Sequence, residues 1–366
     1  MHAKILLLPG DGVGAEVVAA ARGVLEAVAA RFGHQFSLHE EPIGGVALRR
    51  GLRALPEQTL EAAKKADAIL LGAVGDPAFD NAAGERPEAA LLQIRRELKL
   101  YANLRPARVW PGLEDAGPLK AQTLQGTDML VVRELTGGLY YGEPRGLEAD
   151  SAFNTMRYSR HEVTRIARVA FEAARSRRKH ITSVDKANVL ETSRLWRSVV
   201  NDVGAGFPDV TLTHLYVDAC AMKIALAPAS FDVILTENLF GDILSDEAGA
   251  IVGSLGLLPS ASLGDGPGLF EPVHGSAPDI AGKDAANPVG AIASAAMLLR
   301  DGLRLHDEAA AVETAIADVL ANGPKTQDLV SEGAARCSEV GRAIAALTRQ
   351  SRSSPDSSAD RRHTLA

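Results

Sequence analysis

Short apolar runs alternate with longer stretches in which apolar residues recur at helical spacing. Residues 4–8 form an apolar run that ends at Pro9-Gly10, and from Val17 to Val28 the apolar positions follow one face of a helix. The same patterns predict further strands at 36–40, 68–71, 129–132, 180–184 and 231–235, and helices at 60–65, 87–98, 162–176, 288–299 and 306–321. This repeated strand-helix-strand order predicts the α/β class with a largely parallel sheet.

Three segments carry no such pattern. Residues 143–160 are predicted to form an extended arm, and the Gly- and Pro-rich residues 253–289 are predicted to form loops. The tail 351–366 consists mostly of Ser, Arg and Asp without an apolar anchor, which predicts disorder. The length of 366 residues is enough for two domains.

Composition narrows the class of protein. The net charge of −7 gives no sign of a basic surface that would bind nucleic acid or a membrane. The first apolar run stops too early for a signal peptide, and none approaches the ~20 residues of a transmembrane helix. The only cysteines, Cys220 and Cys337, are too few for a disulfide framework or a Cys-based zinc site. These features favour a cytoplasmic globular protein.

The most informative segment is residues 238–249, which read NLFGDILSDEAG. Its helical pattern places Asp242 and Asp246 four residues apart on one face, where two like charges repel unless a cation lies between them. Oxygen ligands of this kind suit Mg²⁺ or Mn²⁺. An isolated pair at this spacing is more often a solvated acidic face, so the metal hypothesis depends on the rest of the chain.

Arginines on three separate predicted segments supply that support. Arg95 belongs to the helix 87–98, Arg105 lies in the sequence ANLRP at 102–106, and Arg133 ends the strand 129–132. Arginine binds carboxylates through two parallel hydrogen bonds. Each arginine alone is most often a surface ion pair, but three beside an acidic pair suggest a dicarboxylate substrate.

Proton-transfer candidates follow strand-like runs. Lys186 comes directly after the strand 180–184, where partial burial favours a role as a base; the alternative is an exposed loop lysine. Tyr140 follows Gly137-Gly138 and is a candidate proton donor or a packed loop tyrosine. Asp218 follows another apolar run, as a third metal oxygen or a helix cap.

Two glycine-containing segments bear on cofactor binding. Gly10, Gly12 and Gly14 nearly match the Rossmann fingerprint, but Ala15 stands where the third glycine belongs, so we interpret the segment as a tight turn that could line a cofactor site. The segment 270–282 is too long for a connector, and loops of this length are usually functional. Its amides and His274 could surround an adenosine, with Asp279 accepting hydrogen bonds from ribose hydroxyls.

At this point the residues match a family. The chain resembles the β-decarboxylating dehydrogenases, most closely their isopropylmalate branch, from about Ile5 to about Thr348. The resemblance is carried by Glu16 and by six sequences: LPGDG at 8–12, ANLRP at 102–106, VRELTGG at 132–138, DKAN at 185–188, NLFGDILSD at 238–246 and FEPVHGSAPDIAG at 270–282.

The resemblance implies a two-domain isopropylmalate dehydrogenase-like fold that is not a Rossmann fold. One domain, on the NAD side, would comprise residues 1–100 and 253–350, and the other, residues 101–252, would carry the arm and the contact of a homodimer. Active sites would be shared, with Lys186 and Asp218 entering from the neighbouring subunit. The implied metal ligands for Mg²⁺ or Mn²⁺ are Asp218, Asp242 and Asp246. The implied NAD contacts are His274, Gly275, Ser276, Ala277, Asp279, Ile280 and Asn287.

The implied substrate contacts are Glu88, Leu91, Leu92, Arg95, Arg105, Arg133, Val189 and Asp218. Relatives share a malate-like core and differ in the C3 substituent, which in the resemblance faces the start of the helix bearing Arg95. Leu91 and Leu92 suit an isopropyl group, whose burial contributes roughly 1.5–3 kcal/mol, and Glu88 would repel a third carboxylate. We therefore expect NAD⁺-dependent oxidation and decarboxylation of 3-isopropylmalate, a step of leucine biosynthesis.

In the implied reaction Lys186 accepts the C2 hydroxyl proton, hydride passes to NAD⁺, CO₂ leaves, and Tyr140 protonates C3. The alternatives are a D-malate or tartrate dehydrogenase of the same family, since leucines do not exclude a small substituent. A catalytically silent regulatory subunit is a third reading, disfavoured because the chain keeps every implied catalytic residue.

Overall fold

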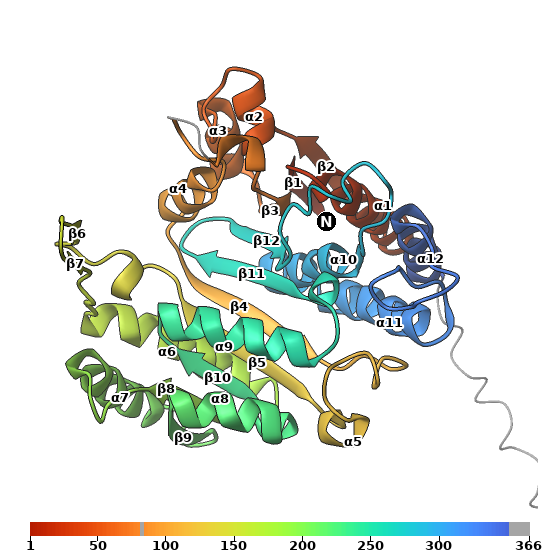
Figure 1. Cartoon of the computed structure of the whole chain (residues 1–366). Coiled ribbons are helices and arrows are strands. Elements are labelled where there is room, and N and C mark those ends of the chain that lie inside the picture. The colour runs from red at the N-terminus through yellow and green to blue at the C-terminus, as the bar shows by residue number, and fades with distance from the viewer. Residues whose placement is uncertain (81–83, 351–366) are drawn as a thin grey trace, which may run out of the picture.

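A computed structural model describes residues 1–80 and 84–350, so the disorder predicted for 351–366 lies outside the described residues. Ten strands of the described part form one sheet in the order β2-β1-β3-β12-β11-β4-β5-β10-β8-β9 (Figure 1). Its strands are β1 (His2–Gly10), β2 (Gln35–Glu40), β3 (Ala68–Ala73), β4 (Leu100–Arg108), β5 (Asp128–Glu134), β8 (His180–Asp185), β9 (Thr211–Tyr216), β10 (Val233–Thr236), β11 (Pro259–Gly264) and β12 (Gly268–Pro272). All neighbours are parallel except β11–β12, β11–β4 and β4–β5. The predicted α/β class with a largely parallel sheet is confirmed.

Helices cover both faces of the sheet (Figure 1). They are α1 (Gly14–Phe32), α2 (Gly45–Arg49), α3 (Glu57–Lys65), α4 (Ala89–Glu97), α5 (Ala121–Leu124), α6 (Arg160–Arg175), α7 (Glu191–Gly204), α8 (Val217–Leu226), α9 (Asn238–Ile251), α10 (Val289–Met297), α11 (His306–Asn322) and α12 (Cys337–Arg349). The first and last helices of the described part lie side by side, because α1 packs against α12.

Strand side chains alternate between three apolar cores. In β1, Ile5 and Leu7 enter one large core, whereas Leu6 and Leu8 enter a smaller core beside α3 and α4. The large core runs along one whole face of the sheet and includes α1, α10 and α6. The opposite face has two separate cores, one beside α4 and one beneath α8 and α9. Burial on both faces explains why the strands are continuous apolar runs.

The prediction that residues 253–289 form loops is wrong for part of that range. Strands β11 and β12 make an antiparallel hairpin in the centre of the sheet, where β12 joins β3 and β11 joins β4. Ser, Gly and Pro dominate β11, whose sequence is PSASLG, so no apolar run or alternation marked it as a strand. Its buried hydroxyls are instead accommodated by hydrogen bonds, such as Ser260 Oγ to the Glu271 carbonyl at 3.0 Å.

The predicted arm contains a ribbon separate from the main sheet. β6 (Gly146–Leu147) and β7 (Ala152–Phe153) pair antiparallel, and Leu147 at the ribbon's end is 88% exposed. An apolar side chain presented in this way is unusual unless another surface covers it. No helix within 1–80 or 84–350 is both long enough and apolar enough to cross a bilayer.

Candidate active site

A cavity of about 340 Å³ opens on the face of the sheet that carries the two separate cores. It is bordered by the end of β3, the inner side of α4 and the start of α9. Seven of the predicted catalytic, substrate and metal residues line it together: Leu91, Leu92, Arg95, Arg105, Arg133, Tyr140 and Asp242. The sequence therefore predicted side chains that the fold gathers from four separate elements and one loop.

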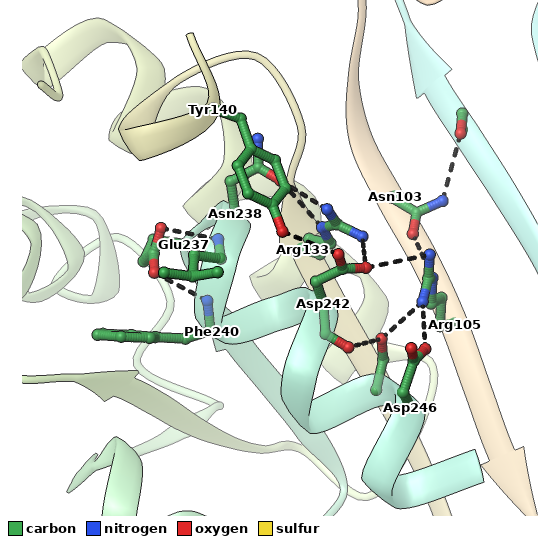
Figure 2. A network of polar contacts seen from close by, with 12 residues as sticks. Asn103, Arg105, Arg133, Tyr140, Glu237, Asn238, Phe240, Asp242 and Asp246 are labelled. Atoms are coloured by element: carbon green, nitrogen blue, oxygen red, sulfur yellow. Dashed lines mark hydrogen bonds and ion pairs between the residues drawn. The ribbon is translucent and has the colours of Figure 1, made fainter. Parts of the chain in front are cut away.

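Helix α9 carries its two aspartates on the side that faces Arg105, and Asp242 lines the cavity (Figure 2). The helix begins after β10, and the side chain of Glu237 caps it by accepting hydrogen bonds from the amides of Leu239 (3.0 Å) and Phe240 (2.8 Å). Asp242 and Asp246 then lie one turn apart, as predicted. Arg105 contacts both, with its Nη1 2.9 Å from Asp246 Oδ1 and its Nη2 3.6 Å from Asp242 Oδ1.

Positive charge surrounds Asp242 more closely than Asp246. Arg133 donates to Asp242 Oδ1, and the Tyr140 hydroxyl donates to Asp242 Oδ2 at 3.0 Å. The Asp246 side chain is 63% exposed, against 34% for Asp242. Asp242, which lines the cavity, and Asp246, one turn further along the helix, both attract guanidinium groups and have the oxygen chemistry that Mg²⁺ or Mn²⁺ requires. A divalent cation fits this pair, although two oxygens fill only part of its coordination shell.

Burial alters the proton affinity of two groups in the cavity. Removal from water lowers the pKa of the Arg133 guanidinium, an effect opposed by the charge of Asp242. Burial, and then the Asp242 carboxylate, raise the pKa of the Tyr140 phenol above its usual value of 10. Tyr140 therefore keeps its proton at neutral pH and can donate it.

Arg95 enters from α4 and has a different partner. Its Nη2 donates to Glu271 Oε1 at 2.6 Å, while its buried Nε has no hydrogen-bond partner among the described residues. Leu91 and Leu92 of the same helix also line the cavity, with Leu91 half-buried and Leu92 exposed. Glu88 stands just before α4 and is exposed, outside the cavity lining.

Lys186, Asp218 and Val189 do not line the cavity of their own chain. Lys186 follows β8 and donates to Asp218 Oδ1 at 2.5 Å, at the start of α8. Val189, three residues beyond Lys186, is 63% exposed. Within the described residues, Asp218 is not brought into one metal-binding group with Asp242 and Asp246. A single chain thus brings together the arginines, Tyr140 and Asp242, but not the proposed base.

The predicted cofactor loop begins at the rim of the same cavity, which His274 and Gly275 line. His274 Nδ1 lies 2.9 Å from the Gly275 carbonyl, so it carries the ring proton, and burial lowers the pKa of the imidazole. The other nitrogen, Nε2, is buried and finds no hydrogen-bond partner in residues 1–80 and 84–350. A neutral imidazole with an unused acceptor fits a ligand that donates a hydrogen bond, as an adenine amino group does.

Beyond Gly275 the loop folds back over the Gly10–Gly14 turn. The Ser276 carbonyl accepts a hydrogen bond from the Val13 amide at 2.8 Å, and a side chain on Gly12 would collide with that carbonyl. The Gly14 amide is likewise used, by the Asp11 carbonyl at 2.9 Å. These amides are not available to a phosphate, which supports the interpretation of the segment as a tight turn.

The remaining predicted cofactor residues differ in exposure. Asp279 is exposed, Ala277 and Ile280 are half-buried, and Ser276 and Asn287 are buried. Asn287 is held from both ends of its amide, since Nδ2 donates to Asp328 at 2.9 Å and Oδ1 accepts from the Val289 amide at 3.0 Å. The loop thus presents a carboxylate to solvent beside a partly apolar floor.

The sequence profile of the Isocitrate/isopropylmalate dehydrogenase family matches residues 4–344. A 3-isopropylmalate dehydrogenase from Aquifex aeolicus is 54% identical over 343 residues, which is 92% of this chain and 93% of the relative. One from Prochlorococcus marinus is 55% identical over 346 residues, covering 92% and 97%. The chain belongs to the isocitrate/isopropylmalate dehydrogenase family. Its fold is also similar to a crystal structure of isocitrate dehydrogenase from Methylococcus capsulatus, with a TM-score of 0.84, 36% identity, and coverage of 96% and 100%.

Family membership confirms the resemblance stated from the sequence. It does not by itself assign a role to any residue, because the family includes enzymes named for different substrates. The geometry adds residues that sequence reasoning missed: Asn103 beside Arg105, Asn238 beside Arg133, and Tyr158 behind Asn238. Asn103 lies in the sequence ANLRP together with Arg105, and Asn238 lies in NLFGDILSD together with Asp242. This closeness in sequence to predicted site residues was the signal that could have identified both asparagines.

Proposed function

We propose that this member of the family catalyses the NAD⁺-dependent oxidation and decarboxylation of 3-isopropylmalate to 4-methyl-2-oxopentanoate and CO₂, in leucine biosynthesis. The relatives at 54% and 55% identity carry the name 3-isopropylmalate dehydrogenase. The observation that carries the proposal is one cavity lined by three arginines, Tyr140 and Asp242 next to Leu91 and Leu92. The polar groups suit a 2-hydroxy dicarboxylate, and the leucines suit its branched alkyl group.

Each side chain of the cavity has a distinct task in this proposal. Arg95, Arg105 and Arg133 bind the two substrate carboxylates, since guanidinium groups match carboxylate geometry. Lys186 accepts the proton of the C2 hydroxyl. Tyr140, whose raised pKa keeps it protonated, returns a proton to C3 after CO₂ has left.

Two groups from solution complete the reaction. Mg²⁺ or Mn²⁺, held by Asp242, Asp246 and Asp218, would supply positive charge that acidifies the substrate hydroxyl and stabilises the enolate. NAD⁺, held by His274, Gly275, Ser276, Ala277, Asp279, Ile280 and Asn287, would take the hydride from C2. The buried, unpartnered Nε2 of His274 supports an adenine-binding role for this loop.

A homodimer with shared sites is proposed because Lys186, Val189 and Asp218 lie outside the cavity of their own chain. Apolar side chains are exposed on the adjoining helices, with Met222 at 66% and Leu226 at 71% on α8, and Ile243 at 57% on α9. Their burial against a second copy would be favourable. The same copy could bring its Lys186 and Asp218 to the aspartates of α9.

The proposed domains, 1–100 with 253–350 and 101–252, follow the two separate cores on the active-site face. The core beside α4 draws on residues 6–100 and Leu269, whereas the core beneath α9 draws on residues 107–252 and Leu258. The cavity lies between them. We place the enzyme in the cytoplasm, consistent with Cys220 and Cys337 being buried free thiols.

D-malate or tartrate oxidation by the same residues is the second candidate, favoured by one observation: Leu92 is 53% exposed, so the apolar wall is not closed in a single chain. The fold does not distinguish the substrates, because one of its structural neighbours is an isocitrate dehydrogenase. A side-by-side assay of NADH formation with 3-isopropylmalate, D-malate, tartrate and isocitrate decides.

In that assay we expect kcat/KM for 3-isopropylmalate to exceed that for D-malate by about 10–200-fold or more, because even one added methylene in an apolar pocket gives this range. Isocitrate should be a poor substrate, since its third carboxylate would face the apolar side chains of Leu91 and Leu92. Leu91→Ala should reduce the advantage of 3-isopropylmalate while leaving D-malate turnover nearly unchanged. Comparable efficiency on isocitrate would overturn the assignment of this wall.

Cofactor choice is the second property that the proposal predicts. An exposed carboxylate at Asp279 accepts hydrogen bonds from ribose hydroxyls and repels a 2′-phosphate, so NAD⁺ should be preferred to NADP⁺. Replacing Asp279 by Lys together with Ile280 by Tyr is expected to lower kcat/KM for NAD⁺. It should also raise the ratio of kcat/KM for NADP⁺ to kcat/KM for NAD⁺. Asp265→Lys, an equivalent charge change in the exposed β11–β12 turn, is the control. An unchanged ratio in the folded double variant would mean that Asp279 only stabilises its turn.

A further inference from the structure

Two of the three cavity arginines rest on the side-chain oxygen of a buried asparagine. Asn238, the first residue of α9, accepts at Oδ1 from Arg133 Nε (3.0 Å) and Nη2 (2.8 Å). Asn103, on β4, accepts at Oδ1 from Arg105 Nε at 2.8 Å. Both asparagines are 1% exposed, and Figure 2 shows them behind the guanidinium groups, on the side away from Asp246 for Arg105 and from Asp242 for Arg133.

The orientation of each amide is fixed from its other end. Asn238 Nδ2 donates to the Gly137 carbonyl at 3.2 Å, and Asn103 Nδ2 donates to Ser262 Oγ at 3.2 Å. A flipped amide would turn an NH₂ group against a guanidinium, which has no acceptor. The oxygen therefore always faces the arginine, and each guanidinium plane is set by a rigid part of the fold.

Asn238 is not needed to cap its helix. Glu237 already accepts from the amides of Leu239 and Phe240, so the Asn238 side chain is free for another contact. Its backbone amide donates to the Tyr158 hydroxyl at 3.0 Å, and the Tyr158 ring packs against Gly137 and Gly138, which precede Tyr140. The side-chain amide of Asn238 connects Arg133, which donates to its Oδ1, to the segment before Tyr140, because its Nδ2 donates to the Gly137 carbonyl.

An uncharged acceptor matters for electrostatics. A carboxylate in either place would hold the arginine as firmly but would offset part of its positive charge, as Glu271 does beside Arg95 at 2.6 Å. Arg133 already faces Asp242, so a second carboxylate would leave it little net attraction for a substrate. An amide oxygen orients the guanidinium without adding a further negative charge to those of Asp242 and Asp246.

We propose that Asn238 and Asn103 are positioning residues, which orient Arg133 and Arg105 through neutral oxygens so that both arginines keep their charge for the substrate carboxylates. This inference rests on the proposed function only in requiring a substrate with the malate core. It predicts a loss of substrate affinity upon Asn→Asp substitution, although that change preserves shape and the acceptor atom.

The test compares Asn238→Asp and Asn103→Asp with the wild-type enzyme. The expected result is a rise of about 10–100-fold in KM, and in the calorimetric Kd for substrate with Mn²⁺, as for a lost hydrogen bond to a charged group. The value of kcat should change much less. Asn201→Asp, which adds the same charge on the exposed face of α7 beside His214, should leave KM unchanged.

Two features keep the experiment decisive. In Asn238→Asp the new oxygen faces the Gly137 carbonyl, at 3.2 Å from the atom it replaces, which destabilises the fold. In Asn103→Asp the Ser262 hydroxyl can rotate and donate to the new oxygen, and the nearest carbonyl partner of the replaced atom, that of Ala261, is farther away at 3.4 Å. If Asn238→Asp does not fold, the KM and Kd of Asn103→Asp therefore test the proposal. A lowered Tm with wild-type KM and Kd would show a merely structural role and overturn the proposal.

For each variant, KM and Kd are divided by the wild-type values. Both are measured with the substrate that the wild type turns over best among 3-isopropylmalate, D-malate, tartrate and isocitrate. All four share the malate core that the arginines are proposed to bind. If the wild type prefers D-malate, the proposed function fails while the ratio still tests the asparagines. If the wild type prefers 3-isopropylmalate and the ratios stay near one, only the positioning role fails.

Discussion

Replacing Lys186 by Met is expected to remove oxidation of 3-isopropylmalate almost completely, by about 10²–10⁴-fold in kcat, the usual contribution of a positioned proton acceptor. Methionine keeps the length of the side chain but cannot accept a proton. The measurement is NADH formation under saturating substrate, metal and NAD⁺. Lys64→Met, which removes an exposed lysine from α3, is the control and should retain wild-type turnover.

The same variant tests whether active sites are shared. Tyr140→Phe should also be impaired, in the steps after hydride transfer. A purified hybrid dimer of Lys186→Met with Tyr140→Phe would have one site with both residues intact, if Lys186 acts in the neighbouring subunit, and about half of the wild-type activity. If Lys186 instead served its own chain, neither site of the hybrid would be intact, and the hybrid would be as inactive as its parents.

Asp242→Asn should have the second largest effect. Asp242 touches Arg133, Arg105 and Tyr140 and is a proposed metal ligand, so its loss removes charge stabilisation of several kcal/mol. That corresponds to roughly a 10³-fold fall in kcat/KM. Calorimetric titration of Mn²⁺ should show weakened binding, which separates a metal role from a purely structural one.

Asp202→Asn is the control for that experiment, because Asp202 pairs with Arg160 on an exposed face of α7 at 3.0 Å. It should leave Mn²⁺ affinity and turnover unchanged. If the extensively dialysed wild-type enzyme remained fully active in EDTA, the proposed metal role of Asp242, Asp246 and Asp218 would be wrong, whatever the variants did.

The spacing of apolar residues in the sequence predicted two kinds of element. These are helices with one buried apolar face and strands whose apolar side chains are buried on both faces. The strand predicted at 68–71 and the helix at 306–321 match β3 and α11 closely. By contrast, β4 contains charged, polar and proline residues in LYANLRPAR, because Asn103 and Arg105 serve the cavity. A strand that carries site residues loses the apolar pattern by which strands are recognised, so β4 was read only as a motif.

The candidate site divides in a similar way. Arg95, Arg105, Arg133, Tyr140 and Asp242 were predicted from residue type and from their places at the ends of elements, and they line one cavity. Asn238 was missed because an asparagine at the start of a helix is ordinarily a cap, and only coordinates reveal that Glu237 performs the capping. Lys186 and Asp218 lie outside the cavity of their own chain. In the proposed homodimer a second chain brings them to the site, and no pattern within one chain specifies the position of that second chain.

The hairpin of β11 and β12 also constrains the order in which the chain can fold. β3 and β4 are separated in the sheet by these two strands alone. A nascent chain that has emerged only as far as residue 252 therefore holds β1, β2 and β3 apart from the five strands β4, β5, β8, β9 and β10, with no backbone pairing to connect the groups. Residues 259–272 must be inserted between two preformed edges, and until then those edges stay open to mispairing. We therefore expect aggregation during synthesis to be greatest before residues 259–272 have emerged and paired with β3 and β4.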